Sequence, residues 1–136
     1  MSIWLKNLIG IFFILHALVY GIMLIPFPDM QGKGIGKYWT DLVGSRLLSP
    51  LNVSNNLLKT VAIAVSLIAM TGFIIAGITI LAAGSPGRLF FITTIIAAGL
   101  SFIFLSLYWH NYNIVGFLIN IAILIYIPIL YLQFNQ

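Results

Sequence analysis

Four long apolar segments dominate this sequence and restrict it to a small set of folds. They cover about residues 5–25, 57–83, 88–109 and 113–132. Each has ~20 residues or more, and at 1.5 Å per residue a helix of that length crosses ~30 Å of hydrocarbon. The segments therefore predict an all-α integral membrane protein, a four-helix bundle that crosses the membrane four times.

The composition supports lipid, rather than water, as the surroundings of this chain. Of its 136 residues 62% are hydrophobic and 6% are charged, whereas soluble domains carry about 25% charged residues. A soluble protein of this composition would expose larger apolar patches than monomers tolerate. The net charge of +4 comes from basic residues scattered singly near helix ends, which fits lipid headgroups and not nucleic acid. We expect one membrane domain, residues 1–136.

The loops between the segments differ in length, and the first, about residues 26–56, is the only long one. Within it, about residues 38–48 place apolar side chains on one helical face. This pattern predicts a short interfacial helix, with Trp39 at headgroup depth and Arg46 snorkelling towards the surface, although a partner-docking helix would look the same. The other two loops are short, so the last three spans should be antiparallel neighbours. Four basic residues on the first-loop side against two on the other favour a cytoplasmic first loop.

Groups that could catalyse a reaction or bind a metal are scarce. The chain has no cysteine and no glutamate, and both aspartates lie in the first loop. His16 lies about 14 Å below the first-loop side and His110 near that surface, so we do not expect a haem between them. No catalytic residue, cofactor or metal site is predicted. An enzyme remains a third alternative, and it would have to use His16 or the residues around His110.

One hydrogen-bonding side chain lies at a similar depth in each span, about 11–14 Å from the first-loop side. These residues are His16, Ser66, Ser101 and Asn120. We predict that they form one polar layer inside the bundle. The layer could hold the helices together, anchor a small ligand such as a quinone headgroup, or act as a proton-linked switch centred on His16.

Aromatic and small residues add two further patterns. Tyr108, Trp109 and His110 follow one another on the first-loop side and are typical of an interfacial belt. Together with Tyr20 and Trp39 they could instead form the roof of a pocket over the polar layer. Small residues recur at four-residue spacing in the first two spans and cluster in the third, which lets helices approach closely. They predict either internal packing or docking onto another membrane subunit. The residues are Ala17 and Gly21, Gly72 and Ala76, and Ala97, Ala98 and Gly99.

The general layout resembles a known group of membrane proteins. His16-Ala-Leu-Val-Tyr-Gly21 in the first span, a long loop with Ser45-Arg46-Leu47, and three tightly connected spans are similar to small four-helix DoxX-like proteins. The resemblance implies a four-helix membrane protein associated with electron-transfer complexes. It assigns no role to any residue of this chain.

Two functions from different classes follow from these patterns. The first is a noncatalytic accessory or structural subunit that stabilises a larger membrane complex through its helix faces, with membrane lipid and other subunits as partners. The alternative is a small transporter or binder of a lipophilic ligand, a quinone or a lipid, that uses the polar layer around His16. A proton-coupled antiporter is disfavoured because no carboxylate lies within a span.

Overall fold

The computed structural model describes residues 2–25, 48–83, 86–109 and 113–134. The described part of the chain contains four long helices, one short 3₁₀ turn and no strand, which confirms the prediction of an all-α four-helix bundle. The interfacial helix predicted at about residues 38–48 lies outside the described residues. The elements are α1 (Ile3–Met23), η1 (Ser49–Leu51), α3 (Asn55–Ala82), α4 (Arg88–Leu107) and α5 (Ile114–Phe134).

Local capping explains where two of the helices begin. The hydroxyl of Ser2 accepts a hydrogen bond from the backbone N–H of Leu5, and the hydroxyl of Ser54 accepts one from Leu57. Each serine thereby satisfies one of the backbone N–H groups that a helix start leaves unpaired. The chain enters α3 through Asn52, whose φ of 51° lies in the left-handed region that asparagine tolerates better than most residues.

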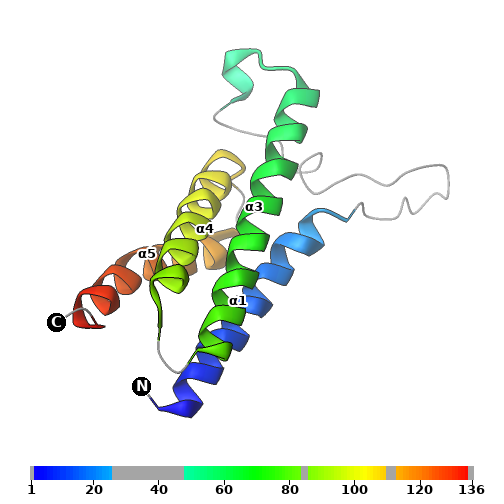
Figure 1. The fold of residues 1–136 in the computed structure, drawn as a ribbon. Coiled ribbons are helices and arrows are strands. Elements are labelled where there is room, and N and C mark those ends of the chain that lie inside the picture. Colours follow the sequence, from blue (N-terminus) through cyan, green and yellow to red (C-terminus); the bar gives the residue numbers. More distant parts are fainter. Residues whose placement is uncertain (1, 26–47, 84–85, 110–112, 135–136) are drawn as a thin grey trace.

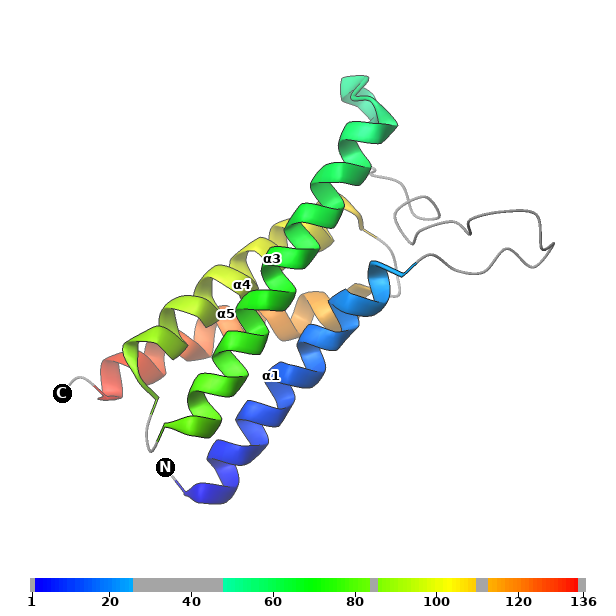
Figure 2. The ribbon, with the colours of Figure 1, turned by 45° about the vertical axis from the view of Figure 1, so that its right-hand side comes forward.

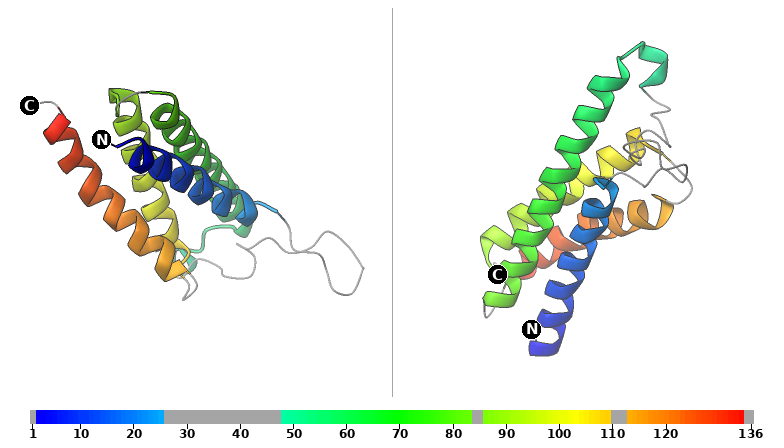
Figure 3. Two further views of the ribbon diagram at one scale, coloured as in Figure 1. Left: turned by 90° about the horizontal axis from the view of Figure 1, so that it is seen from below. Right: turned by 90° about the vertical axis from the view of Figure 1, so that its right-hand side faces the viewer.

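Each long helix packs mainly against the next one in the chain. α1 packs on α3, α3 on α4 and α4 on α5, whereas α1 and α5 do not pack closely along their lengths in the described part. Both chain termini lie at one end of the bundle, and α3 projects furthest at the other end (Figures 1 and 2). Figure 3 shows α1 and α5 as separate from one another when the bundle is seen from below. The four helices therefore form an open arrangement with a gap on the α1–α5 side.

Small residues set the distance between the closely packed helices. A Cβ atom placed on Gly77 of α3 would lie 2.8 Å from the carbonyl oxygen of Gly10 in α1, and one on Gly72 would lie 2.8 Å from the Cβ of Ala97 in α4. Ala76 and Ala97 are fully buried. Of the two alternatives drawn from the small-residue spacing, the structure therefore supports internal packing for Gly72, Ala76 and Ala97, whereas a Cβ on Gly99 would meet nothing within 4 Å.

A lysine joins the beginning of α1 to the end of α3. The Nζ of Lys6 donates hydrogen bonds to the carbonyl oxygens of Leu81, at 3.1 Å, and Ala83, at 3.0 Å. The last carbonyls of a helix lack intrahelical partners and carry a partial negative charge. Lys6 therefore both caps α3 and fixes the terminal end of α1 beside it.

The outward surface of the bundle is apolar. Isoleucine and leucine side chains on all four long helices are largely exposed, for example Ile22 of α1 at 60% and Ile125 of α5 at 61%. Within the described residues four helices are long and apolar enough to cross a membrane. An exposed surface of this kind is unfavourable in water and favourable in lipid, which fits a multi-pass integral membrane protein.

Candidate functional site

A hydrogen-bonded network in the bundle interior connects α1, α4 and α5. The amide nitrogen Nδ2 of Asn120 donates to the Ser101 hydroxyl at 2.6 Å and lies 3.2 Å from the Tyr20 hydroxyl. The Tyr20 and Ser101 hydroxyls bond to each other directly. Nδ2 also lies 2.9 Å from the carbonyl oxygen of Gly116 one turn earlier in α5. Every one of these side chains is buried.

The imidazole ring of His16 lies beside this network. The ring stacks on Phe12 at a centroid distance of 5.7 Å and meets Phe73 edge to face at 4.8 Å. It also lies beside Asn120. Among the described residues neither His16 Nε2 nor Asn120 Oδ1 has a hydrogen-bond partner. We refer to His16, Tyr20, Ser101 and Asn120 as the polar cluster.

The structure brings together three of the four residues of the predicted polar layer and separates Ser66 from them. His16, Ser101 and Asn120 belong to the polar cluster, whereas Ser66 is buried in α3 without a side-chain hydrogen bond to any of them in the described part of the chain. The helix register is the reason. His16 faces Phe73 of α3. Ser66 lies seven residues before Phe73, which is about 10 Å closer to the beginning of α3. Counting depth from the helix ends assumes equal starting levels, but α3 has 28 residues and projects beyond α1.

Sequence reasoning did not assign Tyr20 to the polar layer. Tyr20 follows His16 by four residues, which places both on one face of α1, so the spacing contains the signal. The reach of a tyrosine side chain towards α4 and α5, however, depends on how the helices pack. Thr94 was missed too, and it is fully buried, with no partner for its hydroxyl among the described residues.

The aromatic residues on the first-loop side have different environments. Tyr108 is 1% exposed, and its hydroxyl donates to the carbonyl oxygen of Leu58 at 2.5 Å. This burial raises the pKa of Tyr108 above its ordinary value, and Asn113 donates to its carbonyl oxygen at 2.9 Å. Tyr108 thus connects α3, α4 and the start of α5. Trp109 packs edge to face on Phe117 at 5.2 Å.

Three other residues predicted to lie at the interface, Trp39, Arg46 and His110, are outside the described residues. Within the described residues no group of three histidine, aspartate or glutamate side chains could hold a metal ion. The interfacial helix and the pocket roof that involves Trp39 stay predictions.

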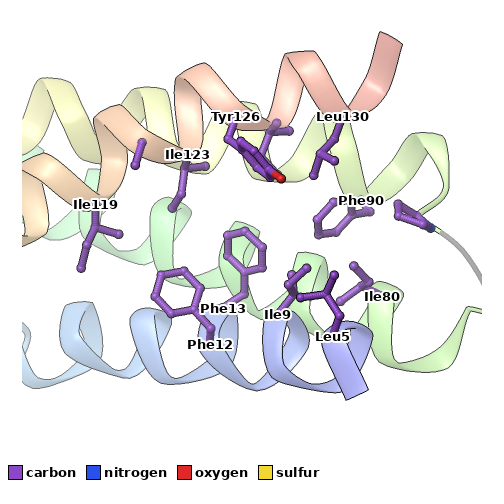
Figure 4. Close-up of a pocket in the computed structure, with 13 residues that line it drawn as sticks. Leu5, Ile9, Phe12, Phe13, Ile80, Phe90, Ile119, Ile123, Tyr126 and Leu130 are labelled. Atoms are coloured by element: carbon purple, nitrogen blue, oxygen red, sulfur yellow. The ribbon is translucent and has the colours of Figure 1, made fainter. Parts of the chain in front are cut away.

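An apolar cavity occupies the gap between α1 and α5, and we call it the lateral groove. Its volume is about 380 Å³. Side chains of α1 and α5 face each other across it, while Ile80 of α3 and Phe90 of α4 lie towards the end where Leu5 and Leu130 are (Figure 4). Its lining residues are Leu5, Ile9, Phe12, Phe13, Ile80, Pro86, Phe90, Ile119, Ala122, Ile123, Tyr126, Ile127 and Leu130.

The lateral groove ends beside the polar cluster. Phe12 and Ile119 lie at one end of it, and Leu5 and Leu130 lie at the other (Figure 4). Phe12 also stacks on His16, and Ile119 directly precedes Asn120 in α5. Among the lining side chains the hydroxyl of Tyr126 is the polar group, and it lies between Ile123 and Leu130 along α5 (Figure 4).

The lateral groove and the polar cluster are the features of the described chain that bear most directly on function. They combine an apolar surface with buried polar atoms that are not all satisfied. Comparison of the chain with protein-family models, with curated proteins and with solved structures finds no match.

Proposed function

We propose that this protein binds a small lipophilic molecule of the membrane, with the apolar part of the molecule in the lateral groove. The observation that carries the proposal is the cavity of about 380 Å³ between α1 and α5. Ligand pockets in proteins range over about 300–1,000 Å³ and are lined mainly by apolar and aromatic side chains. The lateral groove matches both properties.

The walls of the groove favour a flexible chain over a partner helix as its occupant. Helices that associate in membranes present small residues to each other, so that their backbones approach closely. The groove walls instead consist almost entirely of large side chains, with Ala122 as the one small residue that α5 contributes. Gly10, Gly72 and Gly77 are already used in the contacts of α3 with its neighbours.

The mouth of the groove lies on the apolar outer surface, where a ligand can enter from the bilayer. Leu5 is 48% exposed, Phe12 is 39% exposed and Tyr126 is 60% exposed, although all three line the groove. A lipid chain can pass between them without crossing water. Entry of a ligand from the side, out of the bilayer, fits a protein whose helices lie mainly in the membrane.

A substitution that fills the groove tests the proposal. Ala122→Phe adds a ring inside the groove, and Ala64→Phe adds the same ring at an exposed position of α3 that does not line it. Both variants and the unsubstituted protein would be purified in mild detergent, and bound small molecules would be extracted and quantified by mass spectrometry. We expect a near-stoichiometric lipophilic compound with the unsubstituted protein and with Ala64→Phe, and its loss with Ala122→Phe.

Two results would contradict the proposal. One is that the unsubstituted protein carries only bulk lipid in the proportions of the membrane. The other is that both phenylalanine variants retain the same compound in the same amount, since the groove would then not be its site.

The second candidate function, an accessory subunit of a larger complex, is supported by the exposure of α5. Only 17% of the residues in the most apolar stretch of α5 are buried, against 44% in the corresponding stretch of α4. α5 packs mainly on α4. A partner subunit could cover this outer face and leave the groove unfilled. Co-purification of a stoichiometric protein partner that Ala122→Phe does not displace would favour this function over ligand binding.

A further inference from the structure

We infer that the lateral groove holds an acyl chain of an anionic phospholipid, with the headgroup at the membrane surface beside Arg88. The lipid belongs to the leaflet on the side of the two chain termini, which we call the terminal side. This inference rests on the proposed function, because the groove has to hold an apolar chain before a headgroup is placed at its end. It goes further by naming the class of ligand, the leaflet that supplies it and the charge that recognises its head.

The groove has the depth of one leaflet and begins at the membrane surface. Leu5 in the first turn of α1 and Pro86 in the turn between α3 and α4 line the end on the terminal side. From Leu5 to Phe12 the groove follows α1 for about 10 Å, and from Leu130 to Ile119 it follows α5 for about 16 Å (Figure 4). The hydrocarbon of one leaflet is about 15 Å thick, half that of a bilayer. An acyl chain that enters at the surface therefore ends near the middle of the membrane.

The interior of the groove suits hydrocarbon alone. Its walls expose only carbon atoms to the cavity, so a polar or charged head inside it would lose its hydration without gaining a partner. The inner end, at Phe12 and Ile119, lies at the middle of the bilayer. The polar part of a ligand therefore lies at the other end, where the groove reaches the membrane surface.

Basic side chains accompany this surface end. Arg88 lies between Pro86 and Phe90 in the sequence, and both of these residues line the groove. Arg88 is exposed, and its guanidinium makes no hydrogen bond or ion pair with the described part of the chain. Lys6, which caps α3 at this end of the bundle, adds a second positive charge.

The charge at this end selects for an anionic head. The chain has only two acidic residues, Asp29 and Asp41, and neither belongs to a described helix, so the described part of the chain offers Arg88 no carboxylate. A guanidinium binds phosphate through two parallel hydrogen bonds, and basic residues at the membrane surface attract anionic lipids. The cationic amine of a zwitterionic lipid offsets part of this attraction.

The open side of the groove suits a lipid with two chains. Leu5 is 48% exposed and Tyr126 is 60% exposed, although both line the groove. One chain can lie in the groove while the other stays in the bilayer, so a phospholipid need not leave its leaflet. A closed cavity would admit only a ligand with a single chain, such as a fatty acid.

The test follows spin-labelled lipids by NMR, with the full chain in phosphatidylcholine nanodiscs and labelled at isoleucine methyl groups. Phosphatidylglycerol or phosphatidylcholine, each with the same acyl chains and a nitroxide near the chain end, would be titrated in at low mole fraction. Ile119 and Ile123 line the groove, whereas Ile125 of the same helix is 61% exposed and does not line it. Saturable broadening of the two groove methyls beyond that of Ile125 marks a chain in the groove.

We expect phosphatidylglycerol to saturate this broadening at a lower mole fraction than phosphatidylcholine. A basic residue near the membrane surface changes the affinity for an anionic lipid by about fivefold, so the preference should be at least about that large. In Arg88→Gln it should fall by about fivefold. Lys59→Gln is the matched control, because Lys59 lies in the first turns of α3 at the other end of the bundle, and the preference should persist in it.

The position of the nitroxide along the chain tests the leaflet on the unsubstituted protein. Ile127 lies nearer the surface end of the groove, and Ile119 lies at its inner end. A nitroxide near the headgroup should broaden Ile127 more than Ile119. A nitroxide near the chain end should broaden Ile119 more than Ile127.

Three results would overturn the inference: equal saturation by the two lipids, equal effects of Arg88→Gln and Lys59→Gln on the preference, or the opposite order of broadening along the groove. Dodecane, which has no head, separates such a failure from that of the proposed function. Saturable shifts of the groove methyls with dodecane, but no preference for phosphatidylglycerol, would overturn the inference and leave the proposed function standing. Groove methyls that respond to none of the three compounds more than Ile125 does would contradict both.

Discussion

Gly77 is the position where a single added carbon should disturb the bundle most directly. A Cβ in Gly77→Ala would lie 2.7 Å from Cγ1 of Ile14 and 2.8 Å from the carbonyl oxygen of Gly10. Non-bonded carbon atoms prefer about 3.5–4.0 Å. Because one of the crowded atoms belongs to the backbone of α1, a change of rotamer cannot relieve the contact, and the two helices must separate.

The expected magnitude follows from two opposing terms. Overpacking of a closely packed interior costs about 1–3 kcal/mol, whereas replacing a helical glycine with alanine gains about 0.8–1 kcal/mol in helix propensity. Gly99→Ala isolates the second term, since a Cβ there would have nothing within 4 Å. The difference in unfolding free energy between the two variants should therefore be about 1–3 kcal/mol, with Gly77→Ala the less stable.

The difference can be measured by unfolding both variants in mixed micelles with increasing sodium dodecyl sulfate, followed by circular dichroism. The unsubstituted protein provides the reference. If Gly77→Ala proved as stable as Gly99→Ala, the close approach of α1 and α3 at this position would be refuted, together with the structural role assigned to the small residues.

Three further substitutions test individual hydrogen bonds by the same unfolding measurement. Lys6→Met removes both hydrogen bonds to the end of α3 and should lower stability by about 1 kcal/mol; unchanged stability would mean that Lys6 does not cap α3. Tyr20→Phe removes the hydroxyl that hydrogen-bonds to Ser101 and Asn120 and should lower stability by about 1 kcal/mol. Tyr126→Phe, at an exposed position, should leave stability unchanged. Equal effects of the two substitutions would place the Tyr20 hydroxyl outside the network. Burial raises the pKa of Tyr108 in the folded protein. The stability that its hydrogen bond to Leu58 contributes is therefore fully present below a pH of about 10, the pKa of an unperturbed tyrosine, and is lost as the pH rises through the pKa of Tyr108 in the folded protein. Tyr108→Phe should remove this part of the alkaline loss, and an identical alkaline profile in the variant would contradict the assignment.

The sequence was sufficient to predict the number and approximate limits of the described helices. Each span shows itself as an uninterrupted apolar run, and the hydrophobic length needed to cross a bilayer is a property of the local sequence. The end of the third span was placed at about residue 109, and α4 ends at Leu107. Such differences are small because turn-forming residues, visible in the sequence, separate the spans.

The membership of the polar cluster could be predicted only in part. His16, Ser101 and Asn120 were identified because a polar side chain stands out in an apolar span. The separation of Ser66 and the inclusion of Tyr20 depend on the register between helices, which no single helix determines. That register follows from contacts such as Gly10 against Gly77 and His16 against Phe73.

The sequence by itself therefore determined that the chain forms helices long and apolar enough to cross a membrane, with polar groups inside, because helix formation and lipid compatibility follow from local composition. Only the tertiary structure decided that α1 and α5 stay apart and leave the lateral groove between them. The physical reason is that a groove is a property of neighbouring surfaces. Its walls, Phe12 and Tyr126 among them, read in the sequence as ordinary lipid-facing residues until the helices are packed.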